Sequence, residues 1–216
     1  MEPLASKIRP KTLAEFIGQE HLVGPGKPIR EAIEKKHLFS FILWGPPGVG
    51  KTTLAKIYAN ALGADFVELS AVSAGKEDIR KIIDERAGME RSVRLGQAAR
   101  SALFSVPARE SQKPTVLFLD EIHRFNKAQQ DFLLPFVETG RITLIGATTE
   151  NPSFEVISPL LSRCRVFVLN ELSPDELGKI IDRTGIAMDE EARQWVVNFS
   201  NGDARQLLGL LEATQA

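Results

Sequence analysis

The sequence has one cysteine, Cys164, and three histidines in 216 residues. A single cysteine forms no internal disulfide, and Cys164 does not share zinc-ligand spacing with His21, His37 or His123. No apolar run approaches the roughly 20 residues of a membrane-spanning helix, and the N-terminus lacks the apolar core of a secretory signal. We therefore expect a soluble, cytoplasmic chain with no membrane partner and no structural metal.

The sequence also has almost no net charge: 27 Lys and Arg oppose 28 Asp and Glu, which gives a formal charge of −1 at pH 7. A balanced total gives no global attraction to nucleic acid, although a basic face can exist within it. With 43% hydrophobic and 25% charged residues, the composition is that of a globular protein. The length suits one large domain and one small domain.

Residues 41–53 change from a short apolar run to a glycine-rich turn and then to helix formers. Within them, Gly45-x-x-x-x-Gly50-Lys51-Thr52 matches the phosphate-binding P-loop pattern. An ordinary glycine-rich turn explains neither the Lys-Thr pair nor the spacing. Glycines let backbone N–H groups turn toward a phosphate, and the helix start adds its positive end. The expected nucleotide-binding residues are Gly45, Pro46, Pro47, Gly48, Val49, Gly50, Lys51, Thr52 and Thr53.

Two carboxylates follow a second apolar run. Residues 115–119 read as a strand buried on both faces, and Asp120 and Glu121 come directly after it. Ligands of open α/β sheets bind beyond the carboxyl ends of the strands, so these acids should lie beside the P-loop phosphates. We expect Asp120 and Thr52 to hold Mg²⁺, and Glu121 to activate a water that attacks the γ-phosphate. Without the P-loop, the pair would indicate only a solvated helix start.

A third expected strand, residues 142–149, ends in two threonines. We expect Thr149 to hydrogen-bond the attacking water or the γ-phosphate. Thr148 is the adjacent alternative. Because side chains alternate along a strand, only one of the two can face the site, and the sequence leaves open which.

The pattern of elements predicts an α/β fold, in which a P-loop domain of about five parallel strands flanked by helices precedes a small all-helical lid domain. We place the domains at residues 1–171 and 172–216. Strands are expected at 41–44, 66–69, 115–119, 142–149 and 166–169. Helices are expected at 13–16, 28–36, 53–62, after Gly75, at 127–137, and in the lid at 174–183, 189–199 and 203–213.

Residues 88–113 mix several arginines with Gly96 and Pro107 and follow neither the helical nor the strand period. A surface loop is the simpler interpretation. An element that faces DNA or a protein partner is the alternative, because its basic residues would suit either.

Several motifs together resemble the AAA+ ATPases of the clamp-loader group: residues 45–52, Asp120-Glu121, Thr148-Thr149, Ser162-Arg163-Cys164 and Gly202-Asp203-Ala204-Arg205. Longer strings are similar to the RarA/MgsA family, relatives of the Werner-helicase-interacting protein. They lie at residues 9–13, 16–22, 123–131 and 146–154. The resemblance spans nearly the whole chain.

This resemblance implies an ATPase that uses ATP and Mg²⁺ at stalled or damaged replication forks and is associated with the nucleoid. The implied partners are DNA (forks, single-stranded ends or gaps), single-stranded DNA-binding protein, other replication proteins, and further copies of the chain in a tetramer. The family carries a further C-terminal helical domain that assembles the tetramer, whereas this sequence stops at about the end of the lid, so we expect it to be truncated before that domain.

The resemblance also assigns roles to single residues. Arg163 matches the arginine finger that reaches a neighbouring subunit's ATP in trans, and Arg205 matches the second sensor on the lid. A trans arginine neutralises charge on the transferred phosphoryl group, so isolated subunits should hydrolyse ATP weakly. The residues that match the adenine-enclosing segment are Arg9, Pro10, Ile17 and Gly18.

Other functions fit the same motifs. A clamp-loader subunit or a Holliday-junction motor would share the strand-end threonines and the Ser-Arg-Cys element, but the string at residues 123–131 favours the RarA-like interpretation. An alternative of another class is a nucleotide-switched scaffold that binds ATP and partners with negligible turnover.

Overall fold

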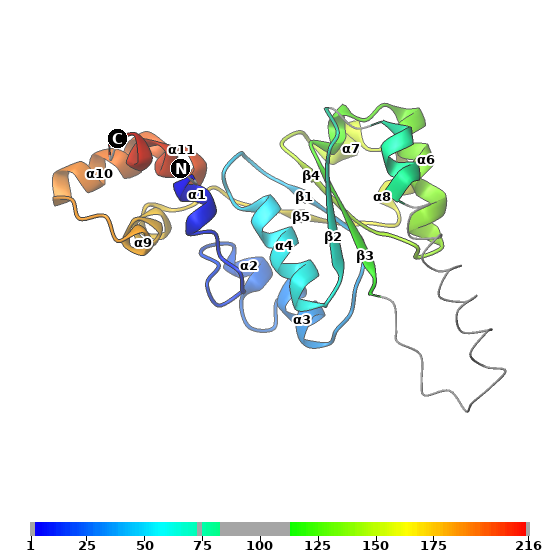
Figure 1. Cartoon of the computed structure of the whole chain (residues 1–216), viewed down its shortest axis with the longest axis horizontal. Helices are drawn as coiled ribbons and strands as arrows, with labels where there is room; N and C mark the ends of the chain where they lie inside the picture. The colour runs from blue at the N-terminus through cyan, green and yellow to red at the C-terminus, as the bar shows by residue number, and fades with distance from the viewer. Residues whose placement is uncertain (1–2, 73–74, 83–112, 215–216) are drawn as a thin grey trace, which may run out of the picture.

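The computed structural model describes residues 3–72, 75–82 and 113–214. Within these ranges a five-stranded parallel sheet has the order β2-β3-β4-β1-β5 (Figure 1). Its strands are β1 (Phe41–Trp44), β2 (Asp65–Ser70), β3 (Thr115–Asp120), β4 (Thr143–Thr148) and β5 (Arg165–Val168). The expected α/β fold is confirmed, and each strand boundary lies within one residue of its predicted place.

Alternate side chains of the central strands enter two separate apolar cores. Phe41 and Leu43 of β1 point into one core, whereas Ile42 between them points into the other, and all three are fully buried. The first core is covered by α3 (Pro28–Glu34) and α4 (Lys51–Ala61). The second is covered by α6 (Lys127–Glu138) and α8 (Ser158–Leu161). Burial on both faces explains why the strands read as continuous apolar runs.

Three C-terminal helices form a further apolar cluster, as the sequence predicts. They are α9 (Pro174–Thr184), α10 (Glu190–Ser200) and α11 (Ala204–Ala213). Each begins at a side-chain cap, supplied by Ser173, Asp189 and Asp203 respectively. Leu177, Ile181, Leu207 and Leu211 are buried among the cluster's core residues.

The N-terminal helix packs on this C-terminal cluster. Leu4, Ala5 and Ile8, in or next to α1 (Leu4–Lys7), contact the cluster, and Figure 1 shows α1 beside α11. The Leu4 N–H donates to a carboxylate oxygen of Glu212 at 3.3 Å. We still propose two domains that divide near residue 171. Helix α1 belongs to the first domain by sequence but packs on the helices of the second.

The N-terminal segment differs from the sequence prediction. Residues 13–15 form a turn in place of the expected helix, because the Glu15 and Phe16 N–H groups bond back only three residues. The helices α1 and α2 (Glu20–Val23) were not predicted, since four residues are too few to leave a helical period. Packing holds them in place.

The remaining short elements connect strands of the sheet. They are the 3₁₀ turn η1 (Ile122–Arg124) after β3 and helix α7 (Pro152–Glu155) after β4. Residues 76–82 are helical, as predicted after Gly75, and Ile79 is buried. Residues 83–112, which include most of the ambiguous 88–113 stretch, lie outside the described residues. None of the helices in the described ranges is long and apolar enough to span a membrane.

Candidate functional site

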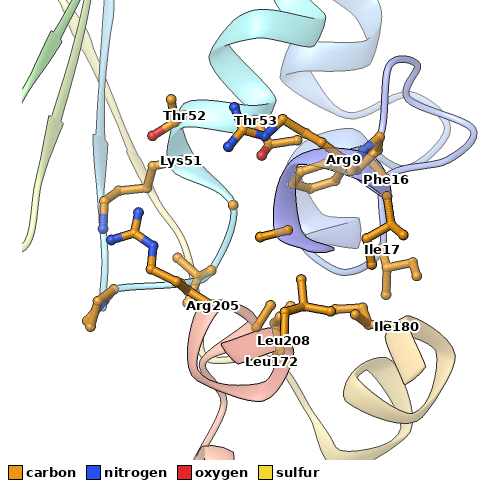
Figure 2. Close-up of a pocket in the computed structure, with 18 of the residues that line it drawn as sticks. Arg9, Phe16, Ile17, Lys51, Thr52, Thr53, Leu172, Ile180, Arg205 and Leu208 are labelled. Atoms are coloured by element: carbon orange, nitrogen blue, oxygen red, sulfur yellow. The ribbon is translucent and has the colours of Figure 1, made fainter. Parts of the chain in front are cut away.

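A cavity of about 300 Å³ lies between the carboxyl ends of the central strands and the C-terminal helices (Figure 2). Its walls come from the N-terminal segment, the loop before α4, the strand ends, and helices α9 and α11. The predicted site residues that line it are Arg9, Pro10, Ile17, Pro47, Gly48, Val49, Gly50, Lys51, Thr52, Thr53, Asp120, Glu121, Thr149 and Arg205. Lys51 and Asp120 thus share one cavity, which the interpretation of the sequence required.

Three predicted binding residues, Gly18, Gly45 and Pro46, do not line the cavity. A Cβ at Gly45 would lie 2.4 Å from the carbonyl oxygen of Leu169, and a Cβ at Gly18 would lie 2.6 Å from a methyl of Leu172. These glycines allow the loop and the N-terminal segment to pack closely on the chain that leaves β5.

The loop glycines at positions 48 and 50 need both their backbone conformation and their lack of a side chain. Gly48 has φ of 68° and Gly50 has φ of 99°, in the left-handed region that glycine adopts readily. A Cβ at Gly50 would lie 2.9 Å from the ring of Phe16. The Gly48 carbonyl accepts a hydrogen bond from the N–H of Ala204 at 3.3 Å. The loop is therefore enclosed by the N-terminal segment on one side and by α11 on the other.

Lys51, the first residue of α4, is a largely buried cation at the end of the glycine loop, residues 45–50. It is 9% exposed, and its Nζ donates to the carbonyl oxygens of Gly45 and Pro46 at 2.7 and 2.8 Å. Burial lowers the pKa of Lys51 below its ordinary value, and the carboxylates of Glu121 and Asp120 act against that shift. A partly desolvated ammonium in this place suits a strongly anionic ligand.

The acid pair reaches the cavity because the chain turns sharply after β3. Glu121 adopts φ of 55° and ψ of 47°, a left-handed conformation that is uncommon for a residue with a side chain. The turn ends the strand at Asp120 and starts η1, so both carboxylates line the cavity. Strand β4 lies between β1 and β3, which places its carboxyl end between the loop and the acids.

The two threonines at the end of β4 have different surroundings. Thr149 lines the cavity, whereas Thr148 has no exposed surface. The Thr148 hydroxyl lies 3.0 Å from Nδ1 of His123 and accepts the Glu150 N–H at 3.0 Å. Side-chain alternation thus directs Thr149 into the cavity and Thr148 into the protein interior.

The two predicted arginines lie in different places. Arg205, in the first turn of α11, lines the cavity, and Figure 2 shows its guanidinium reaching toward the end of the Lys51 side chain. Arg163 lies on the surface after α8 and does not line this cavity. It forms an ion pair with Glu138 and donates to the Pro159 carbonyl oxygen at 2.7 Å. The structure therefore brings Arg205, but not Arg163, to the site of its own chain.

Sequence reasoning missed the apolar wall that faces the loop. Figure 2 shows much of it around the lower right of the cavity. The periodicity identified these side chains as apolar, but only the packing of the C-terminal helices shows which of them reach the cavity. The additional apolar residues of the wall are Ala5, Ile8, Phe16, Leu172, Ile180, Ala204 and Leu208.

A salt bridge joins the N-terminal segment to the C-terminal helices at the cavity. Arg183 of α9 donates to the carbonyl oxygen of Glu15 at 2.6 Å and to its carboxylate at 3.1 Å. The backbone N–H of Lys11 donates to the same carboxylate, and this bond is the largest cause of a lowered pKa for Glu15. Two parts of the chain that are 168 residues apart thus hold one wall together.

The cavity has the groups that a nucleoside triphosphate with Mg²⁺ needs. One end offers a glycine loop at a helix N-terminus together with the cations of Lys51 and Arg205, and the other end is apolar. Thr52 and Asp120 provide a hydroxyl and a carboxylate, the hard oxygen ligands that Mg²⁺ prefers. The volume lies at the lower end of the roughly 300 to 1,000 Å³ of ligand pockets. The residues present therefore fit these groups.

Comparison with known proteins agrees with the geometry. The ATPase family associated with various cellular activities (AAA) matches residues 41–172. Replication-associated recombination protein A of Escherichia coli (strain K12) is 46% identical over 98% of this chain and 45% of its own length. ATPase WRNIP1 of Dictyostelium discoideum is 42% identical over 97% of this chain and 23% of its own length.

A solved structure has a similar fold. The RuvB Holliday junction branch migration motor of Thermotoga maritima superposes with a TM-score of 0.71 and 30% identity, over 95% of this chain and 64% of that one. The present chain spans less than half the length of the curated relatives that it matches. These likenesses cover both the sheet and the C-terminal helices.

Proposed function

Because the chain belongs to the AAA family of ATPases, and to the RarA/MgsA group within it, we propose that its cavity binds ATP with Mg²⁺ and hydrolyses the γ-phosphate in replication-fork maintenance. One observation carries this proposal: Lys51, Asp120 and Glu121 meet in one cavity beside a glycine loop. This arrangement joins an anion cradle to a carboxylate that can act as a base.

In this proposal, loop N–H groups and the start of α4 hold the β- and γ-phosphates. The ammonium of Lys51 exchanges its two carbonyl acceptors for phosphate oxygens, which are better partners for a charged donor. Arg9, Pro10 and Ile17, which line the cavity, enclose the adenine, and Gly18 next to Ile17 packs closely on Leu172. Thr52 and Asp120 would hold Mg²⁺, which neutralises phosphate charge when bound.

Glu121 accepts a proton from the attacking water, and Thr149 orients that water or the γ-phosphate. Arg205 adds a positive charge from α11 that responds to the position of the C-terminal helices. Arg163 acts in trans, on the nucleotide of a neighbouring subunit. Its surface position away from the cavity of its own chain supports this role.

The similarity to curated relatives supports the biological process that we propose for this chain. The name of the Escherichia coli relative connects that protein with replication-associated recombination. We extend this setting to the present chain, with DNA forks, single-stranded ends or gaps, single-stranded DNA-binding protein and other replication proteins as partners. We also propose a homotetramer of the longer protein and a nucleoid-associated, cytoplasmic location.

A Holliday-junction motor is the second candidate, because the superposition on RuvB covers nearly the whole chain. The identity to RuvB is 30%, against 46% to the recombination protein, which favours replication-fork maintenance. Stimulation of turnover by forked DNA but not by a four-way junction would support the first candidate. The reverse order would support the second.

The decisive experiment compares Glu121→Gln with wild type in the longest natural chain that contains this sequence, assembled and assayed with and without forked DNA. We expect the variant to bind ATP with unchanged affinity and to lose turnover, because the amide cannot accept the proton. Glu150→Gln is the matched control, since Glu150 is exposed and lies outside the cavity. Equal turnover of Glu121→Gln and wild type would contradict the proposal. Negligible turnover by wild type, with intact binding, would support a nucleotide-switched scaffold.

A further inference from the structure

A histidine links Glu121 to the end of β4. Nδ1 of His123 lies 3.3 Å from Oε2 of Glu121 and 3.0 Å from Oγ1 of Thr148. We infer that His123 is a positioning residue, which orients the Glu121 carboxylate and couples it to the strand end that carries Thr149. This inference rests on the proposed function, because His123 acts only through the role of Glu121.

The local fold makes this contact specific. The left-handed conformation of Glu121 turns the chain after β3, and His123 in η1 comes within 3.3 Å of the carboxylate. The His123 side chain is 11% exposed and that of Glu121 is 36% exposed. The contact therefore joins a nearly buried ring to a carboxylate that still reaches the cavity.

The contact with Glu121 requires a proton on Nδ1 of His123, because a carboxylate only accepts. The Thr148 hydroxyl has one proton, for which the carbonyl oxygen of Glu150 at 3.2 Å and Nδ1 of His123 at 3.0 Å compete, and it accepts the N–H of Glu150 at 3.0 Å. With the proton on Nδ1, the hydroxyl donates to Glu150 and accepts from His123. The Nδ1–H then faces both the Thr148 hydroxyl and the Glu121 carboxylate.

This shared proton connects two parts of the site. Thr148 directly precedes Thr149, which lines the cavity, so a movement of the strand end toward a phosphate also moves the acceptor of His123. The contact of the Nδ1–H with Oε2 holds one oxygen of Glu121 and thereby the direction of the carboxylate. A base must lie within hydrogen-bond distance of its water, and a misplacement of about 1 Å costs roughly 10²-fold in rate.

The test is a pair of substitutions assayed in the same assembled natural chain. His123→Leu removes the donor, whereas His123→Asn keeps an N–H donor near the place of Nδ1. We expect His123→Leu to lower kcat by about 10- to 100-fold with the KM for ATP and the Kd for ADP within about 2-fold, and His123→Asn to stay within about 3-fold of wild type. His37→Leu, at an exposed histidine outside the cavity, is the matched control and should match wild type.

Two further measurements separate positioning from a structural role. In the Glu121→Gln background, His123→Leu should cause no further loss of the residual turnover, because the group through which it acts is already gone. Long-range ¹H–¹⁵N correlation spectra of the nucleotide-free protein should show the Nδ1–H tautomer for the neutral His123 ring. A neutral Nε2–H tautomer would overturn the inference.

The failure of this inference can be told apart from the failure of the proposed function. Glu121→Gln with wild-type turnover would contradict the function itself. A wild-type kcat of His123→Leu beside an inactive Glu121→Gln would overturn the role of His123 alone. A further loss in the double variant, or an equal loss of ADP affinity, would also overturn it by showing a structural effect.

Discussion

Gly48 and Asp203 are in direct contact, so that a Cβ on the glycine would lie 1.6 Å from Oδ1 of the aspartate. Asp203 is the N-cap of α11, and its carboxylate accepts the N–H groups of Arg205 and Gln206. The tip of the glycine loop therefore rests on the cap of the helix that carries Arg205. This contact couples the place expected for the phosphates to the position of the C-terminal helices.

Gly48→Ala should separate the loop from α11. Its positive φ alone costs about 1–2 kcal/mol for a residue with a Cβ, and the collision with Asp203 adds to that cost. Gly26→Ala is the matched control, because Gly26 has a similar φ of 70° and open space around its Cβ position. In urea unfolding the Gly48 variant should lose more stability than the control, and in titration it should bind ATP at least about 10-fold more weakly. Equal losses in both variants would show that the contact has no energetic weight.

Lys51→Met should remove ATP binding and change how stability depends on pH. Burial, the largest cause, lowers the pKa of Lys51 in the folded state below its ordinary 10.5. Between the folded-state pKa and the unfolded-state pKa of Lys51, the unfolded state binds more protons than the folded state. The buried ammonium therefore lowers the free energy of unfolding at neutral pH. The free energy of unfolding rises again as pH increases from the folded-state pKa to the unfolded-state pKa. We expect a rise of unfolding free energy with pH in wild type that is smaller in Lys51→Met, measured by urea unfolding without nucleotide. Lys179→Met, at an exposed site on α9, should keep the wild-type profile.

Arg183→Met should loosen the wall between α9 and the N-terminal segment. The guanidinium donates to both the backbone carbonyl and the carboxylate of Glu15, so its loss removes both bonds. Glu15→Gln leaves the carbonyl bond in place and should have the smaller effect. We expect ATP affinity to fall about 3- to 10-fold in Arg183→Met, with global stability changed little, because exposed ion pairs contribute little to stability. Calorimetric titration with ATP measures the affinity of both variants. An equal loss of affinity in Arg183→Met and Glu15→Gln would contradict the role of the hydrogen bond from Arg183 to the Glu15 carbonyl oxygen.

The sequence predicted those parts of the molecule whose residue types are fixed by local chemistry. The apolar run before Asp120 had to be a strand buried on both faces, and the loop before Lys51 needed glycines to approach a phosphate. By contrast, the contact between His123 and Thr148 depends on how η1 packs beside β4, and the periodicity of neither segment contains it. The choice between Thr148 and Thr149 stayed open for the same reason, since the phase of a strand against its sheet is a tertiary property.

The N-terminal segment shows where prediction from sequence ends. The sequence predicts a short helix at residues 13–16, but residues 13–15 form a turn, and Phe16 after it packs against the loop glycine at position 50. Arg183 and Glu15 are 168 residues apart in the chain, so no local pattern can indicate that they meet. Contacts of this kind are decided by how the C-terminal helices dock, which is a property of the whole fold.

Arg163 allows a test of action between subunits. It lies outside the cavity of its own chain, next to Cys164, a half-buried residue that packs against the second core and whose thiol pKa burial raises to about 12. If Arg163 serves the next subunit, Arg163→Ala should bind ATP normally and lose about 10³-fold or more in turnover. The exposed Arg141→Ala is the matched control and should keep turnover.

Mixing variants then tests the trans geometry directly. A Lys51→Met subunit has a defective cavity but an intact Arg163, whereas an Arg163→Ala subunit has the reverse. When the two inactive proteins are mixed and assembled, some interfaces combine an intact cavity with an intact arginine, so ATP turnover should recover to a fraction of the wild-type rate. An arginine that acted within its own chain would give no recovery at any mixing ratio, because no subunit would then hold both groups.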